Sequence, residues 1–299
     1  MQAQRRKRPL NGVLMLDKAR GMSSNAALQQ AKRLYQAAKA GHGGTLDPLA
    51  TGLLPLLFGE ATKFSSDLLD ADKSYLAEVR LGISTTTADA EGEIIATRAV
   101  NASAEQLAAA LRIFRGDILQ TPPRYSALKH AGKPLYAYAR AGVEIEPAPR
   151  AVAIHALELQ WFEGERLELA VTCSKGTYIR SLAHDLGVAL GCGAHLAALR
   201  RTAVGRFGLD CAHTLEDLEA MQPAERDTRL LPVDALLQDL PELRLQAADA
   251  ARFLQGQAVP GQARPQCRMR VYGADGILLG VGETDAAGTI APKRVIANA

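Results

Sequence analysis

The stretch "AVAIHALELQWFEGERLELAVTCSKGTYIRSLAHDLGVALG", residues 151–191, decides the fold class. Two largely apolar runs, 151–162 and 166–174, flank a short turn containing Gly164, which predicts a hairpin of antiparallel strands. Residues 175–191 then carry apolar side chains at helical spacing and end on a glycine, which predicts a helix. A hairpin that leads into a helix departs from regular strand–helix alternation. We therefore predict an α+β fold with a mixed, largely antiparallel sheet and flanking helices.

The segments before this stretch add strands and helices without an internal repeat. Residues 12–18 read as an apolar strand that ends at Lys18, and residues 20–38 as a turn followed by a helix that Ser23 or Ser24 can cap. Residues 74–82 and 92–100 read as strands around a polar loop. A helix follows in residues 103–116, with a capping box from Ser103 to Gln106 and a glycine stop.

Three segments depart from this main pattern. Residues 1–8 end in "RRKR", which is either a tail that touches phosphates or a solvated end. Prolines bracket an expected insertion at 122–150, where basic residues alternate with tyrosines. Residues 241–299 hold a short helix and strands separated by glycine turns, which predicts a small β-rich domain. Residues 9–240 then form the main domain.

Composition excludes several classes of function. The chain of 299 residues carries 35 Lys and Arg against 32 Asp and Glu, so net charge alone does not indicate nucleic-acid binding. The four cysteines contain no C-x-x-C pair, and His184, Cys192 and His195 lack an evident ligand geometry, so we expect neither a disulfide framework nor a metal. Motifs of ATP hydrolysis, dinucleotide binding and serine hydrolysis are missing. With no apolar run long enough to span a bilayer, we expect a cytoplasmic protein.

The candidate for chemistry is Asp47, in "GHGGTLDPLATGLL", residues 41–54. Asp before Pro is a common turn former, so a structural role alone is possible. The surrounding glycines, however, permit a bulky ligand to approach the carboxylate closely. A lone acid among apolar neighbours needs a cation, and Arg180 near a helix start is the candidate. An ionised Asp47 could then act as a nucleophile or stabilise an oxocarbenium-like centre at a sugar C1′.

Four ordered motifs, at 41–64, 73–93, 122–142 and 173–207, resemble those of the bacterial TruB-type tRNA pseudouridine synthases. These enzymes isomerise uridine 55 in the T loop of tRNA without a cofactor. The resemblance covers nearly the whole chain, from about Pro9 onward. It implies that Asp47 is the catalytic aspartate and Arg180 its ionic partner. It also implies that Tyr75 stacks on the target uracil and can assist proton removal.

Other positions of the resemblance imply binding roles. His42 would fill space in the T loop that the flipped nucleotides vacate, Tyr178 and Leu199 would line the pocket, and Lys18 matches a lysine near the active site. Two positions depart from the usual family pattern. Ala19 replaces the usual proline, and "GHGGTLDPLATG" replaces the commoner "GHTGALDPLATG". Both changes bear on the stiffness and fine positioning of loops.

The insertion and the C-terminal domain are expected to bind RNA. The insertion would close over an RNA loop through Arg124, Lys129, Lys133 and Arg140. The C-terminal domain resembles a PUA-type RNA-binding domain that would hold the acceptor stem. The plainer alternatives are a solvated amphipathic helix and a stabilising lid. For the whole chain, which we expect to act as a monomer, the alternatives are a non-catalytic tRNA-folding chaperone and a hydrolase that releases uracil.

Overall fold

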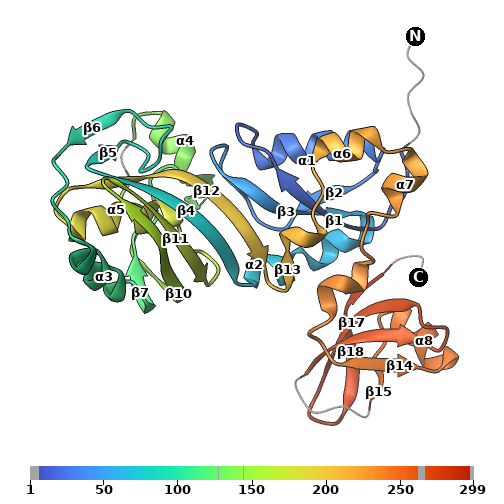
Figure 1. Cartoon of the computed structure of the whole chain (residues 1–299). Coiled ribbons are helices and arrows are strands. Elements are labelled where there is room, and N and C mark those ends of the chain that lie inside the picture. Colours follow the sequence, from blue (N-terminus) through green and yellow to red (C-terminus); the bar gives the residue numbers. More distant parts are fainter. Residues whose placement is uncertain (1–6, 127, 144, 262–266, 297–299) are drawn as a thin grey trace.

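A nine-stranded sheet forms the centre of the main domain in the computed structural model, which describes residues 7–126, 128–143, 145–261 and 267–296 (Figure 1). The strand order is β1-β3-β12-β4-β11-β10-β7, with β2 on β3 and β13 on β12. All neighbouring pairs are antiparallel except β3 and β12, which confirms the predicted mixed sheet. The strands are β1 Gly12–Lys18, β2 Ala40–His42, β3 Thr51–Phe58, β4 Lys73–Leu81, β7 Gly116–Gln120, β10 Arg150–Glu163, β11 Arg166–Cys173, β12 Ala194–Val204 and β13 Phe207–Gly208.

The hairpin and helix at 151–191 form as expected. Strands β10 and β11 pair down to Glu163 and Arg166 around Gly164, whose φ of 58° only glycine adopts readily. Helix α5 spans Ile179–Ala189, a few residues shorter than the predicted range because a turn precedes it. Its buried leucines pack with helix α3, Ala104–Ile113, on the core over β4, β10, β11 and β12. The capping box of α3 is present.

A second core supports the other half of the sheet. Helix α1, Ser24–Leu34, packs with α6, Leu215–Ala220, against β1 and β3. Ser23 caps α1, since its side chain accepts a hydrogen bond from Ala26 N. The remaining short helices of the main domain outside the insertion are η1 Gly59–Phe64, α2 Ser65–Asp70, η2 Leu209–Cys211, α7 Pro223–Asp227 and η3 Val233–Leu237.

The two halves of the sheet meet at a narrow joint. Strands β3 and β12 pair only at Thr51 with Arg200 and at Gly52 with Arg201. Gly52 has a φ of 97°, and a Cβ there would lie 2.2 Å from the Arg201 carbonyl oxygen. Glycine is therefore required for the two strands to approach. Arg200 also binds both carboxylate oxygens of Asp17, at 3.1 and 2.6 Å.

The predicted strand at 92–100 forms differently. Only Ile94–Thr97 is a strand, β6, and it pairs with β5, Ile83–Thr85, in a separate ribbon outside the main sheet. Gly82, with a φ of 83°, separates this ribbon from β4. The turn between β5 and β6 carries Asp89, which becomes important in the site described below.

The insertion leaves and re-enters the sheet at neighbouring points. Strand β7 ends at Gln120, β10 begins at Arg150, and these two residues are register partners. Between them lie a small hairpin, β8 Lys129–His130 with β9 Lys133–Pro134, and helix α4 Leu135–Arg140. The two ends of the insertion therefore lie side by side at the outer edge of the sheet.

The C-terminal residues form a β-rich unit with its own core. Its strand order is β14-β16-β17-β18-β15, with a short helix α8, Ala247–Leu254. The strands are β14 Glu242–Leu245, β15 Val259–Pro260, β16 Arg268–Gly273, β17 Leu278–Thr284 and β18 Thr289–Val295.

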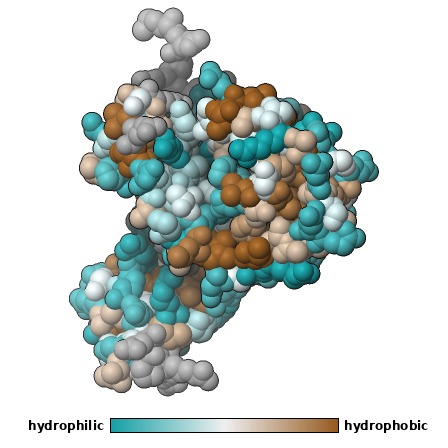
Figure 2. All heavy atoms as spheres, turned by 90° about the vertical axis from the view of Figure 1, so that its left-hand side faces the viewer, coloured by the Kyte–Doolittle hydropathy of each residue, from teal (hydrophilic) through white to brown (hydrophobic). Residues whose placement is uncertain are grey.

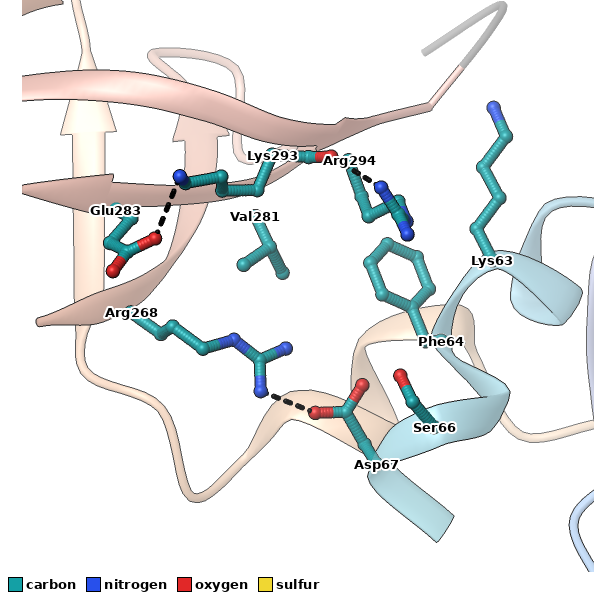
Figure 3. Close-up of a pocket in the computed structure, with 9 residues that line it drawn as sticks. All are labelled: Lys63, Phe64, Ser66, Asp67, Arg268, Val281, Glu283, Lys293 and Arg294. Carbon is teal, nitrogen blue, oxygen red and sulfur yellow. Dashed lines mark hydrogen bonds and ion pairs between the residues drawn. The ribbon is translucent and has the colours of Figure 1, made fainter. Parts of the chain in front are cut away.

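Specific contacts attach this unit to η1 and α2. Arg268 lies 2.9 Å from Asp67, and Lys63 donates to the Val295 carbonyl at 2.8 Å. Figure 3 shows the pocket at this junction, with Phe64 between the two parts. Phe64 also belongs to a small buried cluster with Val281 and Ile296 of the unit. Ion pairs and apolar packing together hold the unit against the main domain.

Figure 2 shows separate apolar patches on the face at the left of Figure 1. Exposed apolar residues include Ile113 of α3, Leu119 of β7 and Val188 of α5.

Arg8 of the basic N-terminal segment is paired with Asp227, whereas residues 1–6 lie outside the described part. Among the described residues, we find no helix with the length and apolarity needed to cross a membrane.

Candidate active site

Asp47 sits on a turn between β2 and β3 that neighbouring groups hold in place. Ala50 N donates to the Asp47 carbonyl at 3.1 Å, which closes the turn. Ser24, the buried first residue of α1, accepts from Leu46 N at 2.7 Å and donates to Leu46 O at 2.9 Å. The Asp47 side chain remains 43% exposed, so a ligand can reach it.

Arg180 is the cation beside Asp47. Its Nε lies 3.0 Å from Asp47 Oδ2, and its side chain is only 6% exposed. Its Nη2 donates to the Tyr125 carbonyl at 2.8 Å, and its Nη1 donates to the Thr87 carbonyl at 3.3 Å. The guanidinium is thus fixed by the insertion and by the β5–β6 turn while one edge faces the carboxylate.

Asp89 is a second acid at this site, and the sequence interpretation missed it. Asp89 is 3% exposed, and its Oδ2 lies 3.4 Å from Arg180 Nη1. Its other oxygen accepts from Glu91 N at 3.1 Å and from the Thr87 hydroxyl. The only signal in the sequence was an acid that follows three threonines, and Glu91 and Glu93 close behind it made Asp89 less distinct than Asp47.

Two cations offset the burial of the Asp47 carboxyl. Burial raises the pKa of Asp47, the neighbouring Asp89 raises it further, and Arg180 and Lys18 lower it. Lys18, at the end of β1, is 1% exposed and donates to the carbonyls of Ala19 and Met22 at 2.9 and 2.7 Å. Burial lowers the pKa of Lys18 to about 8, against the attraction of Asp47.

Tyr75 and Arg201 connect the sheet to the Asp47 turn. They are register partners on β4 and β12, and Arg201 is 1% exposed. The Arg201 guanidinium donates to the carbonyls of Leu53, Thr45 and Gly44 at 2.7, 3.4 and 3.2 Å. Burial raises the pKa of the Tyr75 hydroxyl, whereas its interaction with Arg201 lowers it. Arg201 therefore fixes the turn that presents Asp47, a role the sequence interpretation did not assign.

His42 and Leu199 lie on strands that flank the same joint. His42 ends β2 and is half-buried, and its Nδ1 is buried without a hydrogen-bond partner among the described residues. Burial lowers the pKa of His42, and Arg201 lowers it further. Leu199 of β12 is partly buried and contacts both large cores.

Tyr178 is held differently from the other site residues. It is the residue before α5, two positions from Arg180. Its backbone N–H and carbonyl bind the side chain of Gln120, and the Arg150 guanidinium lies 5.1 Å from its ring centre. Tyr178 thus joins the insertion, the sheet edge and the helix that carries Arg180.

Three of the four RNA-contacting residues expected in the insertion are exposed. Lys129 and Lys133 are exposed on the two strands of its hairpin, and Arg124 is exposed near its start. Arg140 ends α4, but its side chain lies outside the described part of the structure. Tyr138 donates to the His130 carbonyl at 3.1 Å, and its ring packs edge-on against the His130 imidazole. Tyr138 thus stabilises the hairpin.

Taken together, the site is a partly exposed carboxylate held by a buried guanidinium, with a buried lysine that lowers its pKa and a tyrosine whose own pKa the carboxylate raises. Such a site can stabilise positive charge on a substrate above it. In the described ranges, no three His, Cys, Asp or Glu side chains are grouped so as to hold a metal ion, and all four cysteines are free thiols.

Comparison with known proteins gives consistent matches along the chain. Residues 32–179 match the family model "TruB family pseudouridylate synthase (N terminal domain)". Residues 180–238 match "tRNA pseudouridylate synthase B C-terminal domain", and residues 241–296 match "Pseudouridine synthase II TruB, C-terminal".

Curated relatives and solved structures agree with these models. A tRNA pseudouridine synthase B of Methylobacillus flagellatus is 56% identical over 300 residues, covering 100% of this chain and 99% of the relative. One from Burkholderia mallei is 57% identical, covering 97% and 98%. The structure resembles a chain from the "Crystal Structure of a Cbf5-Nop10-Gar1 Complex", with 26% identity, a TM-score of 0.72 and coverage of 97% and 85%.

Proposed function

The chain belongs to the TruB family of pseudouridylate synthases and isomerises uridine to pseudouridine in tRNA, and we propose that Asp47 performs this reaction on uridine 55 of the T loop. The observation that carries the assignment is the 3.0 Å contact between Arg180 Nε and Asp47 Oδ2 on a partly exposed turn. This contact supplies what the reaction needs, an anionic carboxylate of fixed orientation that a nucleotide can reach.

The reaction exchanges one bond at the sugar for another. The N1–C1′ bond breaks, the uracil turns, and its C5 joins C1′, with no net oxidation. The uracil departs as a stabilised anion, so a single carboxylate can stabilise or capture the cationic C1′. Arg180 and Lys18 lower the pKa of Asp47 against the effect of burial, which favours the ionised form that this step requires.

The flipped nucleotide needs apolar and aromatic surface around the carboxylate. We assign to Tyr75, the register partner of Arg201, stacking on the uracil and assistance in the removal of the proton from C5. Leu199 and Tyr178 line the pocket, and His42 occupies the space that flipped nucleotides leave in the T loop. Lys18 acts through its charge rather than by contact with RNA, because its ammonium group is buried.

The rest of the chain binds the tRNA. The insertion at 122–150 contacts the T loop through Arg124, Lys129, Lys133 and Arg140, and the exposed positions of Lys129 and Lys133 support this role. The PUA-like domain at 241–299 holds the acceptor stem. The enzyme works as a monomer in the cytoplasm, without a cofactor.

The test is to map pseudouridine in unmodified tRNA after incubation with the purified protein alone. We expect product at position 55 and none in a tRNA that carries cytidine there. Asp47→Asn should abolish product formation while tRNA affinity changes less than about twofold. Product at another position would overturn the target, and substantial product from Asp47→Asn would overturn the assigned residue. Release of free uracil would indicate a hydrolase instead.

A further inference from the structure

The two ends of the insertion both hold Tyr178. Gln120, the last residue of β7, accepts from Tyr178 N at 2.7 Å and donates to Tyr178 O at 3.0 Å. Arg150, the last residue of the insertion and the first of β10, lies over the Tyr178 ring and donates to the Gly176 carbonyl at 2.5 Å. Because Gln120 and Arg150 are register partners, they approach Tyr178 from a single place on the sheet edge.

Two further bonds join the start of the insertion to the start of α5. The Ser181 hydroxyl donates to the Thr121 carbonyl at 2.8 Å, and Arg180 Nη2 donates to the Tyr125 carbonyl at 2.8 Å. The chain is therefore held on both sides of Arg180, at Tyr178 before it and at Ser181 after it.

Burial of the Gln120 side chain makes its contact with the Tyr178 backbone restrictive. Its side chain is 1% exposed, so its amide must find partners within the protein, and both partners belong to one residue. Tyr178 precedes the first turn of α5, and its side chain makes no capping hydrogen bond. Gln120 thus fixes the direction in which the chain enters α5, and Arg180 lies in that first turn.

We propose that Gln120 and Arg150 are positioning residues for the isomerisation: they hold Tyr178 and the start of α5 so that the Arg180 guanidinium stays on Asp47. This inference rests on the proposed roles of Asp47 and Arg180. Neither residue needs to touch the reacting atoms. A displacement of about 1 Å at a reacting pair can lower a rate about 100-fold.

The experiment measures the single-turnover rate and the tRNA dissociation constant of Gln120→Leu and Arg150→Met. We expect each variant to form pseudouridine about 10- to 100-fold more slowly, with a dissociation constant within about twofold of the wild type. Two control variants lose bonds between a side chain and the backbone elsewhere. Gln106→Leu removes a glutamine that binds the residue before α3, and Arg115→Met removes an arginine that binds the Leu157 carbonyl. Both controls should keep the wild-type rate.

A pH profile separates positioning from simple loss of stability. Since Arg180 lowers the pKa of Asp47, a displaced guanidinium should move the acidic limb of the rate to higher pH. Loss of stability alone would change the melting temperature and leave that limb in place.

The inference is overturned if both folded variants keep the wild-type rate, or if their loss lies in tRNA affinity alone. Should Gln120→Leu fail to fold, Arg150→Met decides, because its side chain is only partly buried. An active wild type that Asp47→Asn inactivates would show that the proposed function stands even where this inference fails.

Discussion

Asp89 Oδ2 lies 3.4 Å from Arg180 Nη1, so the guanidinium that holds Asp47 is itself bound by a second, buried carboxylate. Arg180 also donates to the Thr87 and Tyr125 carbonyls, and Asp89 adds a second charged partner that restricts its motion. Asp89 also raises the pKa of Asp47 through its negative charge. Asp47 is thus partly exposed and open to a ligand, whereas Asp89 is buried and orients Arg180.

Asp89→Asn should separate these two effects. The variant should react about 10- to 100-fold more slowly near pH 7.5, because Arg180 loses its orienting charge. As long as Arg180 keeps its contact with Asp47, the acidic limb of the rate should move to lower pH, because one negative charge beside Asp47 is gone. A limb at higher pH would show that Arg180 has moved away from Asp47. Single-turnover rates measured across pH test both effects. Asp185→Asn, which alters an exposed acid on α5, the helix that carries Arg180, is the control.

Lys18→Met should move the acidic limb of the reaction rate to higher pH. The reaction needs an ionised Asp47, so the rate falls as pH decreases through its pKa, which burial already raises above the ordinary value. Removing the Lys18 charge takes away one of the groups that lower it. The limb should move to higher pH in a variant whose circular dichroism is unchanged. A limb at the wild-type position would mean that Lys18 does not act on Asp47.

The adjacent arginines of β12 should differ sharply in their effect on stability. Arg201→Lys leaves backbone carbonyls of the buried joint without donors, and we expect a loss of about 1 to 3 kcal/mol in the free energy of unfolding. Arg200→Lys weakens a half-exposed ion pair with Asp17 and should lose about 1 kcal/mol or less. Urea denaturation measures both, and equal losses would contradict the assigned roles.

Lys73 should make stability depend on pH in the alkaline range. Its ammonium donates to three carbonyls near the end of α2, and burial lowers its pKa from 10.5 to about 8. Between pH 8 and 10.5 the unfolded chain binds more protons at this group, so the free energy of unfolding rises with pH there, by at most about 3 kcal/mol. Lys73→Met should lose this contribution. Unfolding curves at pH 7.5 and 10 for both proteins measure how the free energy of unfolding changes with pH. An equal change in the two proteins would contradict the role of Lys73.

Neutralising the hairpin of the insertion should change the salt dependence of binding. If Lys129 and Lys133 contact phosphates, replacing each by alanine should flatten the slope of log affinity against log salt by about 0.7 to 0.9. Lys175→Ala, which alters an exposed lysine paired with Asp70, should leave the slope unchanged. Equal slopes in the hairpin variants and the wild type would show that the hairpin is merely solvated.

The fold was predictable wherever local pattern and packing agree. The β10–β11 hairpin and α5 form where alternation, a glycine turn and helical spacing coincide. The strand expected at 92–100 shrinks to β6, because its two isoleucines stay exposed on a ribbon outside the main sheet. Apolar content alone does not report whether a partner strand is available.

The candidate site was predictable in part. Asp47 stood out because it lies alone among glycines, and Arg180 because it starts a helix. Asp89, Gln120 and Arg201 were missed because their importance depends on contacts with residues far away in the chain. A buried arginine that binds only carbonyls and a tyrosine leaves no spacing pattern that a sequence could reveal.

The glycine at the joint of the sheet has a consequence for how such a chain can vary. Position 52 tolerates no side chain, and the strands it brings together also support the turn that presents Asp47. A substitution there would damage folding and turnover together, whereas the C-terminal unit keeps its own core and the hairpin and helix of the insertion lie beyond its contacts with α5. Efforts to redirect such a scaffold toward other RNAs should therefore exchange the C-terminal unit or the segment 129–140 and leave the joint of the sheet unchanged.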